Sequence, residues 1–99
     1  MNGMRAIHPG EILKEELVEL KLSANAIAKA LDVPTNRITA ILNGQRGITA
    51  DTALRLAKFF STTPDFWMSL QSSYDVKKAR EAVGQEIERK VKPRELISA

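Results

Sequence analysis

The chain has 99 residues, of which 43% are hydrophobic and 27% are charged, with a formal net charge of +3. This length provides one domain with a modest core, and the composition is ordinary for a soluble globular protein. Because there is no cysteine and only one histidine, disulfides and thiolate metal sites are excluded. No apolar run reaches the roughly 20 residues that span a bilayer, and no signal-peptide pattern is present. We therefore expect a cytoplasmic protein.

The spacing of apolar residues predicts helices along nearly the whole chain. Three leucines at i, i+4 and i+7 predict a first helix over about 10–20: Leu13, Leu17 and Leu20. A short second helix follows Ser23, whose hydroxyl can accept a hydrogen bond from a free backbone amide. Asp32 and Pro34 end this helix, because aspartate tolerates a left-handed backbone and proline cannot lie inside the preceding helix.

Three further helices are predicted. The third covers about 35–43 and ends near Gly44. The fourth follows a Thr49 cap, and its apolar stripe comprises Ala53, Leu56, Ala57 and Phe60. Thr63 and Pro64 place proline at the first position of a fifth helix, whose apolar side carries Phe66, Trp67, Leu70 and Tyr74. A weaker helical pattern continues to about residue 90, and we expect the C-terminal end to be loosely ordered.

Residues 23–43 combine a capped short helix, a tight turn and a second short helix. Ala28 is small where the two helices must approach closely. The apolar residues that would fix their crossing are Ile27, Leu31, Val33, Ile38, Ile41 and Leu42. This is the arrangement of a helix-turn-helix unit, whose second helix enters the major groove of DNA. The alternative is plain helical packing, since such short patterns also occur by chance.

The predicted outer face of the third helix is polar or small and contains no acid, which phosphate would repel. Its residues are Thr35, Asn36, Arg37, Thr39, Ala40 and Asn43. Asparagine can pair with adenine, arginine with guanine, and the methyl groups of alanine and threonine can contact thymine. Ser23, Lys29 and Arg46 flank the unit, where hydroxyls, amines and helix N-termini can hold phosphates. These nine residues are the predicted DNA contacts.

Charge is distributed unevenly. The first helix carries four acids, Glu11, Glu15, Glu16 and Glu19, against Lys14. The stretch 77–94 is mainly basic, with Lys77, Lys78, Arg80, Arg89, Lys90, Lys92 and Arg94 against three glutamates. This separation suits a protein with a polyanion on one side. The alternatives are solvated helix faces and, for the basic stretch, contact with an acidic region of a partner.

The sequence offers little for catalysis. His8 has no second member of a catalytic set nearby, and its place before Pro-Gly favours a structural role such as a capping hydrogen bond. There is no nucleophile–base pair, phosphate-binding loop or metal-ligand cluster, so we expect neither an enzyme nor a cofactor. Core packing is the first interpretation of the aromatic residues, and a dimer interface is the second: Phe59, Phe60, Phe66 and Trp67.

Several motifs occur together in the chain. They are HPGEIL at 8–13, AKALDVP at 28–34, ITAILNG at 38–44, GITADTALRLA at 47–57 and PDFWMSLQ at 64–71. This combination resembles the HigA/VapI antitoxins of bacterial toxin–antitoxin operons, which belong to the Xre/Cro family of helix-turn-helix repressors. The resemblance covers about residues 7–80, and the stretch after about residue 84 departs from it.

The resemblance implies an all-α, five-helix, lambda-repressor-like helix-turn-helix domain over 1–80. The basic charge and weak helical pattern of the rest predict a basic helical extension over 81–99 with a disordered end. The resemblance implies a homodimer that binds double-stranded operator DNA and represses its own operon. It also implies a toxin partner, a small HigB/RelE-like protein that cleaves mRNA on the ribosome and is held inactive. By the family pattern, the DNA contacts include Thr35, Asn36, Arg37, Thr39 and Ala40.

The family pattern also implies that the fifth helix helps to form the dimer. The predicted interface residues are Phe66, Trp67, Leu70 and Tyr74. Two alternatives remain for the function. One is a solitary repressor without a toxin. The other is a toxin-sequestering module with weak DNA binding, suggested by the acidic first helix, because an RNA-cleaving partner should be basic.

Overall fold

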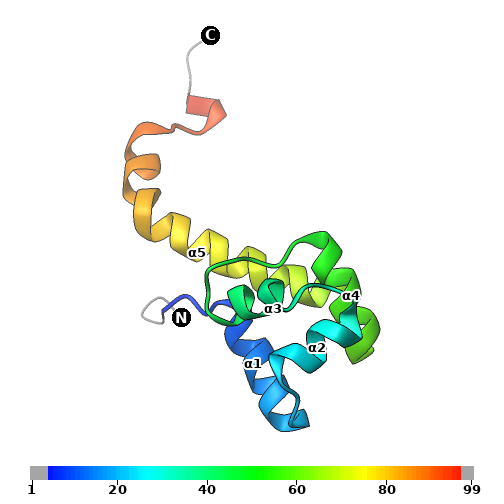
Figure 1. The fold of residues 1–99 in the computed structure, drawn as a ribbon. Helices are drawn as coiled ribbons and strands as arrows, with labels where there is room; N and C mark the ends of the chain where they lie inside the picture. Colours follow the sequence, from blue (N-terminus) through cyan, green and yellow to red (C-terminus); the bar gives the residue numbers. More distant parts are fainter. Residues whose placement is uncertain (1–4, 97–99) are drawn as a thin grey trace.

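The computed structural model describes residues 5–96 and contains five α-helices in this range (Figure 1). They are α1 (Pro9–Leu20), α2 (Ala24–Leu31), α3 (Thr35–Leu42), α4 (Ala50–Phe60) and α5 (Pro64–Lys90), followed by a short 3₁₀ helix, Arg94–Leu96. No strand occurs in residues 5–96, so the all-helical prediction is confirmed. The expected loose C-terminal end falls on residues 97–99, which lie outside the described range.

The predicted N-caps start the helices as expected. The Ser23 hydroxyl accepts a hydrogen bond from the backbone N–H of Ala26 at 3.0 Å and starts α2. Thr49 and Thr63 accept corresponding bonds at the starts of α4 and α5. The ends also agree: Asp32 closes α2 with a left-handed backbone (φ 58°), and Gly44 has φ 74° beyond α3. These boundaries depend on interactions within one helical turn, which explains why the sequence predicts them.

The start of α1 is tied down by two reciprocal bonds. His8 Nδ1 accepts from the backbone N–H of Gly10 at 2.9 Å, and the Glu11 carboxylate accepts from the backbone N–H of His8 at 3.2 Å. Arg5 donates two further bonds to Glu11, and these lower the pKa of its carboxyl to about 2. The ring of His8 also packs edge-on against Tyr74. The capping role predicted for His8 is confirmed.

The core lies where α1, α2, α3 and α4 meet the first turns of α5. Its buried residues are Leu13, Leu17, Ile27, Ala28, Leu31, Ile38, Ile41, Ile48, Ala53, Leu56, Ala57 and Trp67. Most of the predicted stripes are therefore confirmed. Leu20 is an exception, because it is 49% exposed at the last residue of α1, where no helix covers it. Ile48, in the loop before α4, completes the core although no helical pattern marks it.

Trp67 lies in the core of the domain and not on its surface. Its side chain is 1% exposed, and its indole N–H donates to the Thr62 hydroxyl at 2.9 Å. Phe60 and Phe66 pack against the indole ring. Core packing, the first interpretation of Trp67, is therefore confirmed, and no side-chain surface is left for the dimer contact that the family pattern implied.

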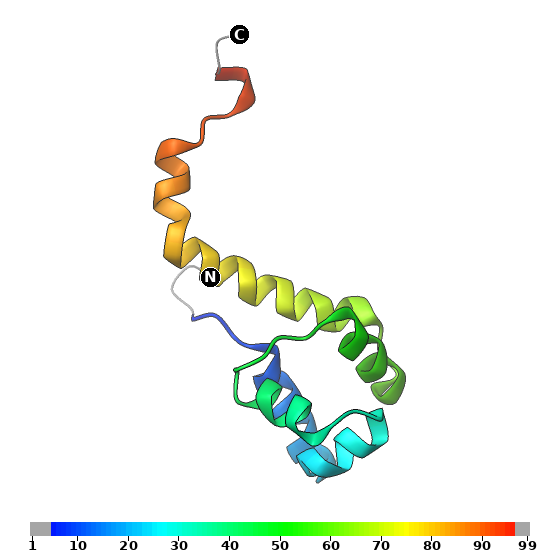
Figure 2. The same ribbon diagram turned by 45° about the horizontal axis from the view of Figure 1, so that its top comes forward.

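The domain is compact, but α5 extends well beyond it (Figures 1 and 2). The first turns of α5 pack against α4 and α1, and the C-terminal third projects away from all other helices. The radius of gyration is 17.3 Å, whereas a compact domain of this length would have about 13 Å. The extension predicted after residue 80 is helical to Lys90 and belongs to α5, whose axis bends where the helix leaves the domain (Figure 2).

Gly10 of α1 lies very close to the backbone of α3. A Cβ atom at Gly10 would collide with the carbonyl oxygen of Ile41 and come within 3.0 Å of His8 Nδ1. Because both neighbours are held in place, they cannot move aside easily. Gly10 therefore determines how closely α1 packs on the helix that carries the predicted DNA-reading face.

We expect Gly10→Ala to lower the free energy of unfolding by about 1–3 kcal/mol, the usual effect of overpacking a core. Urea denaturation followed by circular dichroism would measure it. Gly84→Ala is the matched control, since its Cβ would meet only the flexible Arg80 side chain. The control should be neutral or stabilising, because alanine is the better helix former. Equal stability of the Gly10 variant and the parent would contradict the steric argument.

Candidate nucleic-acid interface

The helices α2 and α3 form a compact unit joined by a three-residue turn, Asp32–Pro34. Ile27, Ala28 and Leu31 of α2 pack against Ile38 and Ile41 of α3, and all five are buried. Across the outer edge of this contact, the Thr35 hydroxyl donates to the Asn25 side-chain oxygen at 2.7 Å. The first turn of α3 is thus fixed to the first turn of α2. Thr35, a predicted DNA contact, already uses its hydroxyl proton in this bond.

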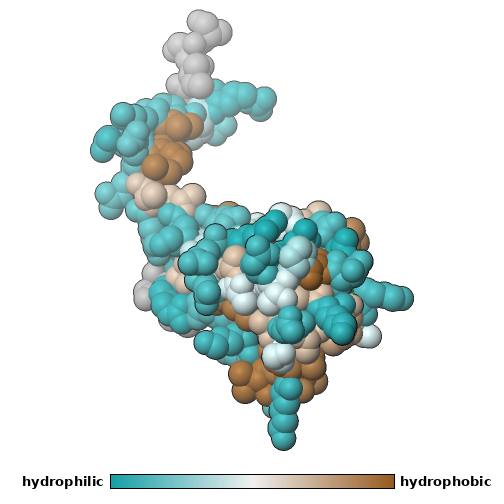
Figure 3. Space-filling model, in the orientation of Figure 1, coloured by the Kyte–Doolittle hydropathy of each residue, from teal (hydrophilic) through white to brown (hydrophobic). Residues whose placement is uncertain are grey.

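The outer face of α3 is polar and short-chained. Asn36, Thr39, Ala40 and Asn43 are spaced at i, i+3, i+4 and i+7, which places them on one side of the helix. Asn36 and Asn43 are exposed, and Thr39 and Ala40 are half-buried. In Figure 3, hydrophilic and near-neutral residues cover the centre of the molecule, where Figure 1 places α3. The face has the shape and chemistry of a helix that reads base edges in a major groove.

Arg37 lies at the edge of this face and is not free. Its guanidinium donates to a carboxylate oxygen of Asp51 at 2.9 Å, and its side chain is only 24% exposed. Asp51 is the second residue of α4, so the bond joins the first turn of α3 to the first turn of α4. The predicted acid-free surface therefore has one acid at its border, supplied by a helix 14 residues further along the chain.

The same carboxylate holds a second arginine. Arg55 donates to Asp51 at 2.8 Å and, through another nitrogen, to the backbone carbonyls of Leu31 and Asp32 at 2.9 and 3.2 Å. These carbonyls are at the C-terminal end of α2, where backbone acceptors lack helical partners. Arg55 therefore ties α4 to the turn of the helix-turn-helix unit.

The two arginines change the titration of Asp51. Hydrogen bonds from Arg55 and then from Arg37 lower the pKa of the Asp51 carboxyl below its ordinary value of 3.8. The same contact with Asp51 raises the pKa of Arg55. Through these bonds Asp51 links α3, α4 and the C-terminal end of α2.

The loop between α3 and α4 is held from the opposite side. Gln71 of α5 accepts a hydrogen bond from the backbone N–H of Ile48 at 2.6 Å and donates to Asp75. This loop carries Arg46, which is exposed. Gln71 thus positions a predicted phosphate contact through the backbone, over a separation of 23 residues.

The other predicted flanking residues lie around the same unit. Ser23 and Lys29 are exposed, at the start and in the last turn of α2. The structure therefore brings the nine predicted residues together around α3, although Thr35 and Arg37 have partners within the protein. Sequence reasoning missed Asn25, Asp51, Arg55 and Gln71. Only the i, i+4 spacing of Asp51 and Arg55 is a recognisable pairing signal.

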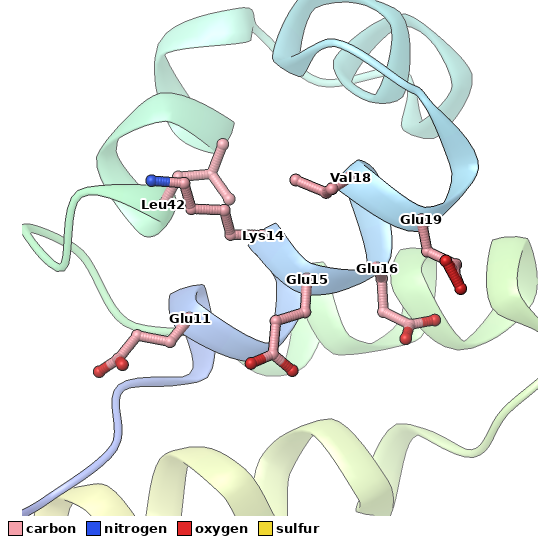
Figure 4. Close-up of a pocket in the computed structure, with 7 residues that line it drawn as sticks. All are labelled: Glu11, Lys14, Glu15, Glu16, Val18, Glu19 and Leu42. Carbon is pink, nitrogen blue, oxygen red and sulfur yellow. The ribbon is translucent and has the colours of Figure 1, made fainter.

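A second surface lies on α1. Four glutamates and Lys14 line an open groove of about 700 Å³ together with Val18 and Leu42 (Figure 4). In the close-up, the carboxylates of Glu15, Glu16 and Glu19 point away from the helix, whereas the Glu11 carboxylate is held by Arg5 and the backbone N–H of His8. Val18, also in this groove, is 70% exposed. The acidic face predicted for the first helix thus exists, next to apolar surface.

No group of three or more histidine or acidic side chains is placed to hold a metal ion in residues 5–96. Within the same range, every helix is either too short or too polar to cross a membrane.

A domain of five helices that presents a short, polar, exposed helix after a tight turn is a helix-turn-helix domain of the DNA-binding type. The sequence profile of the helix-turn-helix family HTH_3 matches residues 13–67. The chain belongs to this family, which is of the Xre type and is non-enzymatic. The fold class and the absence of an enzymatic role agree with the sequence-based predictions.

Within this family, the chain is similar to several antitoxins and to a virulence-associated protein. Virulence-associated protein I of Dichelobacter nodosus is 53% identical over 81 residues, which cover 81% of this chain and 75% of that protein. An addiction module antidote protein of the HigA family from Coxiella burnetii is 66% identical, with a TM-score of 0.90, over 91% of this chain and 99% of that one. The Pseudomonas aeruginosa antitoxin HigA, solved with the higBA promoter, is 46% identical, with a TM-score of 0.88. The match covers 91% of this chain and 99% of that one. The predicted resemblance to HigA antitoxins is confirmed.

The low pKa of Asp51 predicts a pH-dependent stability. Since the pKa of this carboxyl is lower in the folded state, its contribution is complete above the unfolded value and is lost as the pH falls through the folded value. We expect the melting temperature of the parent to exceed that of Asp51→Asn at neutral pH. The difference should shrink below about pH 4. Thermal unfolding at a series of pH values would measure it.

Arg37→Gln is the control for this titration, because it removes one of the two donors and leaves the carboxylate. In this variant the pKa of Asp51, followed by NMR of the carboxyl carbon, should rise part of the way back towards 3.8. A melting-temperature difference that stays constant down to strongly acidic pH would refute the assigned network.

Proposed function

We propose that this protein is an autoregulating antitoxin that binds the operator of its own operon through α3. Its exposed polar face, with Asn36 and Asn43 on the surface and Thr39 and Ala40 beside them, carries the proposal. The relatives support it, because the Pseudomonas aeruginosa antitoxin HigA was solved with the higBA promoter and the antitoxin GraA was solved in complex with its operator. In this proposal Asn36, Thr39, Ala40 and Asn43 contact bases, and Ser23, Lys29 and Arg46 contact phosphates.

Fluorescence anisotropy on the DNA upstream of the gene, with a scrambled duplex as control, tests this function. The parent should bind the upstream DNA much more tightly than the scrambled duplex. Asn36→Ala should lose about 1–3 kcal/mol, and its preference should relax at one base pair. Ser69→Ala, a polar truncation on the exposed side of α5, should bind as the parent does. Equal, weak and salt-sensitive binding of the parent to both duplexes would indicate phosphate attraction alone.

We also propose that the protein acts as a homodimer. The projecting end of α5 carries Val83 and Ile87 four residues apart, Val91 follows as the residue that ends the helix, and all three are exposed. Figure 3 shows this hydrophobic surface along the part of α5 that leaves the domain. An isolated helical segment with an apolar stripe is marginally stable in water, so a second chain would stabilise it. Among the interface residues predicted from sequence, Phe66 is 45% exposed, and Leu70 and Tyr74 are half-buried.

The homodimer predicts a palindromic operator with half-sites about 34 Å apart. Ile87→Asp should shift the protein from dimer to monomer in sedimentation velocity, because it places a charge in the apolar stripe. Val18→Asp is the matched control on a more exposed valine of α1, and it should remain dimeric. A dimeric Ile87→Asp variant would place the interface elsewhere on the protein.

Neutralisation of a HigB/RelE-like mRNA-cleaving toxin is the second part of the proposal. The acidic groove of α1 supports it, because the carboxylates of Glu15, Glu16 and Glu19 next to the exposed Val18 suit a basic protein partner. The test is to co-express the chain with the product of any small basic reading frame beside its gene and measure mRNA cleavage. If the toxin is neutralised but the operator is not preferred, the toxin-sequestering alternative holds. If no such partner gene exists, the chain is a solitary repressor.

A further inference from the structure

Asp51 is an unexpected residue at the border of a DNA-binding surface. A carboxylate near DNA is repelled by phosphate, and this one is more than half exposed beside α3. Part of its role is local, since an acid in the first turn of α4 interacts favourably with the helix dipole. That role does not require contact with Arg37, which comes from another helix.

The two arginines bound to Asp51 are held very differently. Arg55 has three acceptors, namely Asp51 and the carbonyls of Leu31 and Asp32. The Arg37 guanidinium has Asp51 as its single hydrogen-bond acceptor among the described residues. Arg55 is thus fixed by the end of α2, whereas Arg37 can leave Asp51 without breaking any other bond. Of the two, only Arg37 belongs to the helix proposed to enter the groove.

We propose that Asp51 is a specificity-determining residue. It occupies the Arg37 guanidinium in free protein and on random DNA, and releases it only where the operator offers a better acceptor. The proposal rests on the proposed operator binding. Its physical basis is a competition between Asp51 and DNA for the Arg37 guanidinium. The exposed ion pair with Asp51 is weak, but a single DNA phosphate binds the guanidinium little more strongly than the carboxylate does. A guanine edge accepts two bonds from one guanidinium and is a stronger competitor.

Specificity would thus arise partly from lowering the affinity for wrong DNA. Discrimination depends on the difference between two affinities, so an intramolecular acceptor that competes mainly with non-specific contacts increases it. Each additional phosphate neutralised by a basic group steepens the dependence of log affinity on log salt by about 0.9. The proposal therefore predicts a salt signature as well as a change in affinity.

Asp51→Asn tests this directly in the full chain. Binding to the scrambled duplex should tighten severalfold, and its salt slope should steepen by about 0.9. Binding to the upstream duplex should change less, so the ratio of the two affinities should fall. Asp51→Glu, which keeps the charge, should restore most of the discrimination. Unchanged discrimination and salt slope in Asp51→Asn would overturn the proposal.

Two controls separate this competition from the loss of a negative charge. Asp65→Asn removes an acid from the corresponding second position of α5, away from Arg37, and should leave both affinities unchanged. In an Arg37→Gln background, Asp51→Asn should no longer tighten binding to scrambled DNA. If it tightens binding there by the same factor, Asp51 acts through its charge alone and the proposal is wrong. Melting temperatures of all variants would show that each is folded.

The outcome is distinguishable from a failure of the proposed function. A parent protein that does not prefer the upstream duplex would refute operator binding. The scrambled-duplex measurements with and without Arg37 would still decide whether Asp51 holds this arginine away from DNA.

Discussion

The short helix α3 depends on its neighbours for its existence and its position. It has eight residues, and a helix of this length is unstable alone in water. Its apolar side is buried through Ile38 and Ile41, while the opposite side remains exposed. Its first turn is bonded to α2 through Thr35 and to α4 through Arg37, and its last turn meets α1 where Gly10 allows close approach. A helix held in this way can present side chains to DNA with little freedom left to lose on binding.

The polar network around α3 also connects stability to recognition. Arg55 satisfies carbonyls at the end of α2 and, through Asp51, reaches the edge of the reading face. Exposed ion pairs of this kind contribute little to stability individually. Their main consequence is geometric, because they fix the relative orientation of three short helices that share a small core. A modest energetic contribution can therefore have a large effect on which side chains reach the DNA.

The molecule divides into a helix-turn-helix domain and the projecting end of α5. The first turns of α5 complete the core through Trp67 and position the α3–α4 loop through Gln71. The same helix then leaves the domain with an apolar stripe that no described residue covers. The acidic groove of α1 lies on a separate surface. DNA, a second copy and a toxin could thus occupy different faces of one small protein.

The sequence by itself determined the helices, their ends and most of the core. Ser23, Thr49 and Thr63 act within one turn, and apolar spacing of three and four residues identifies the buried side of each helix. Such signals are local and can be read along the chain. The motifs also indicated the family, since several of them recur together over most of the domain.

Only the tertiary structure determined which contacts the helices and loops make with one another. Arg37 meets Asp51 across 14 residues and Gln71 meets Ile48 across 23, and no local pattern records either pairing. Trp67 is buried although the family pattern implied a dimer contact, and Leu20 is exposed although the sequence predicted it in the apolar stripe of the first helix. Both differences have the same reason. Both residues lie on apolar stripes, but whether another helix covers a stripe at a given turn depends on packing. The sequence therefore indicated the helix that we propose to read DNA, and the fold determined which of its side chains are exposed and which have partners within the protein.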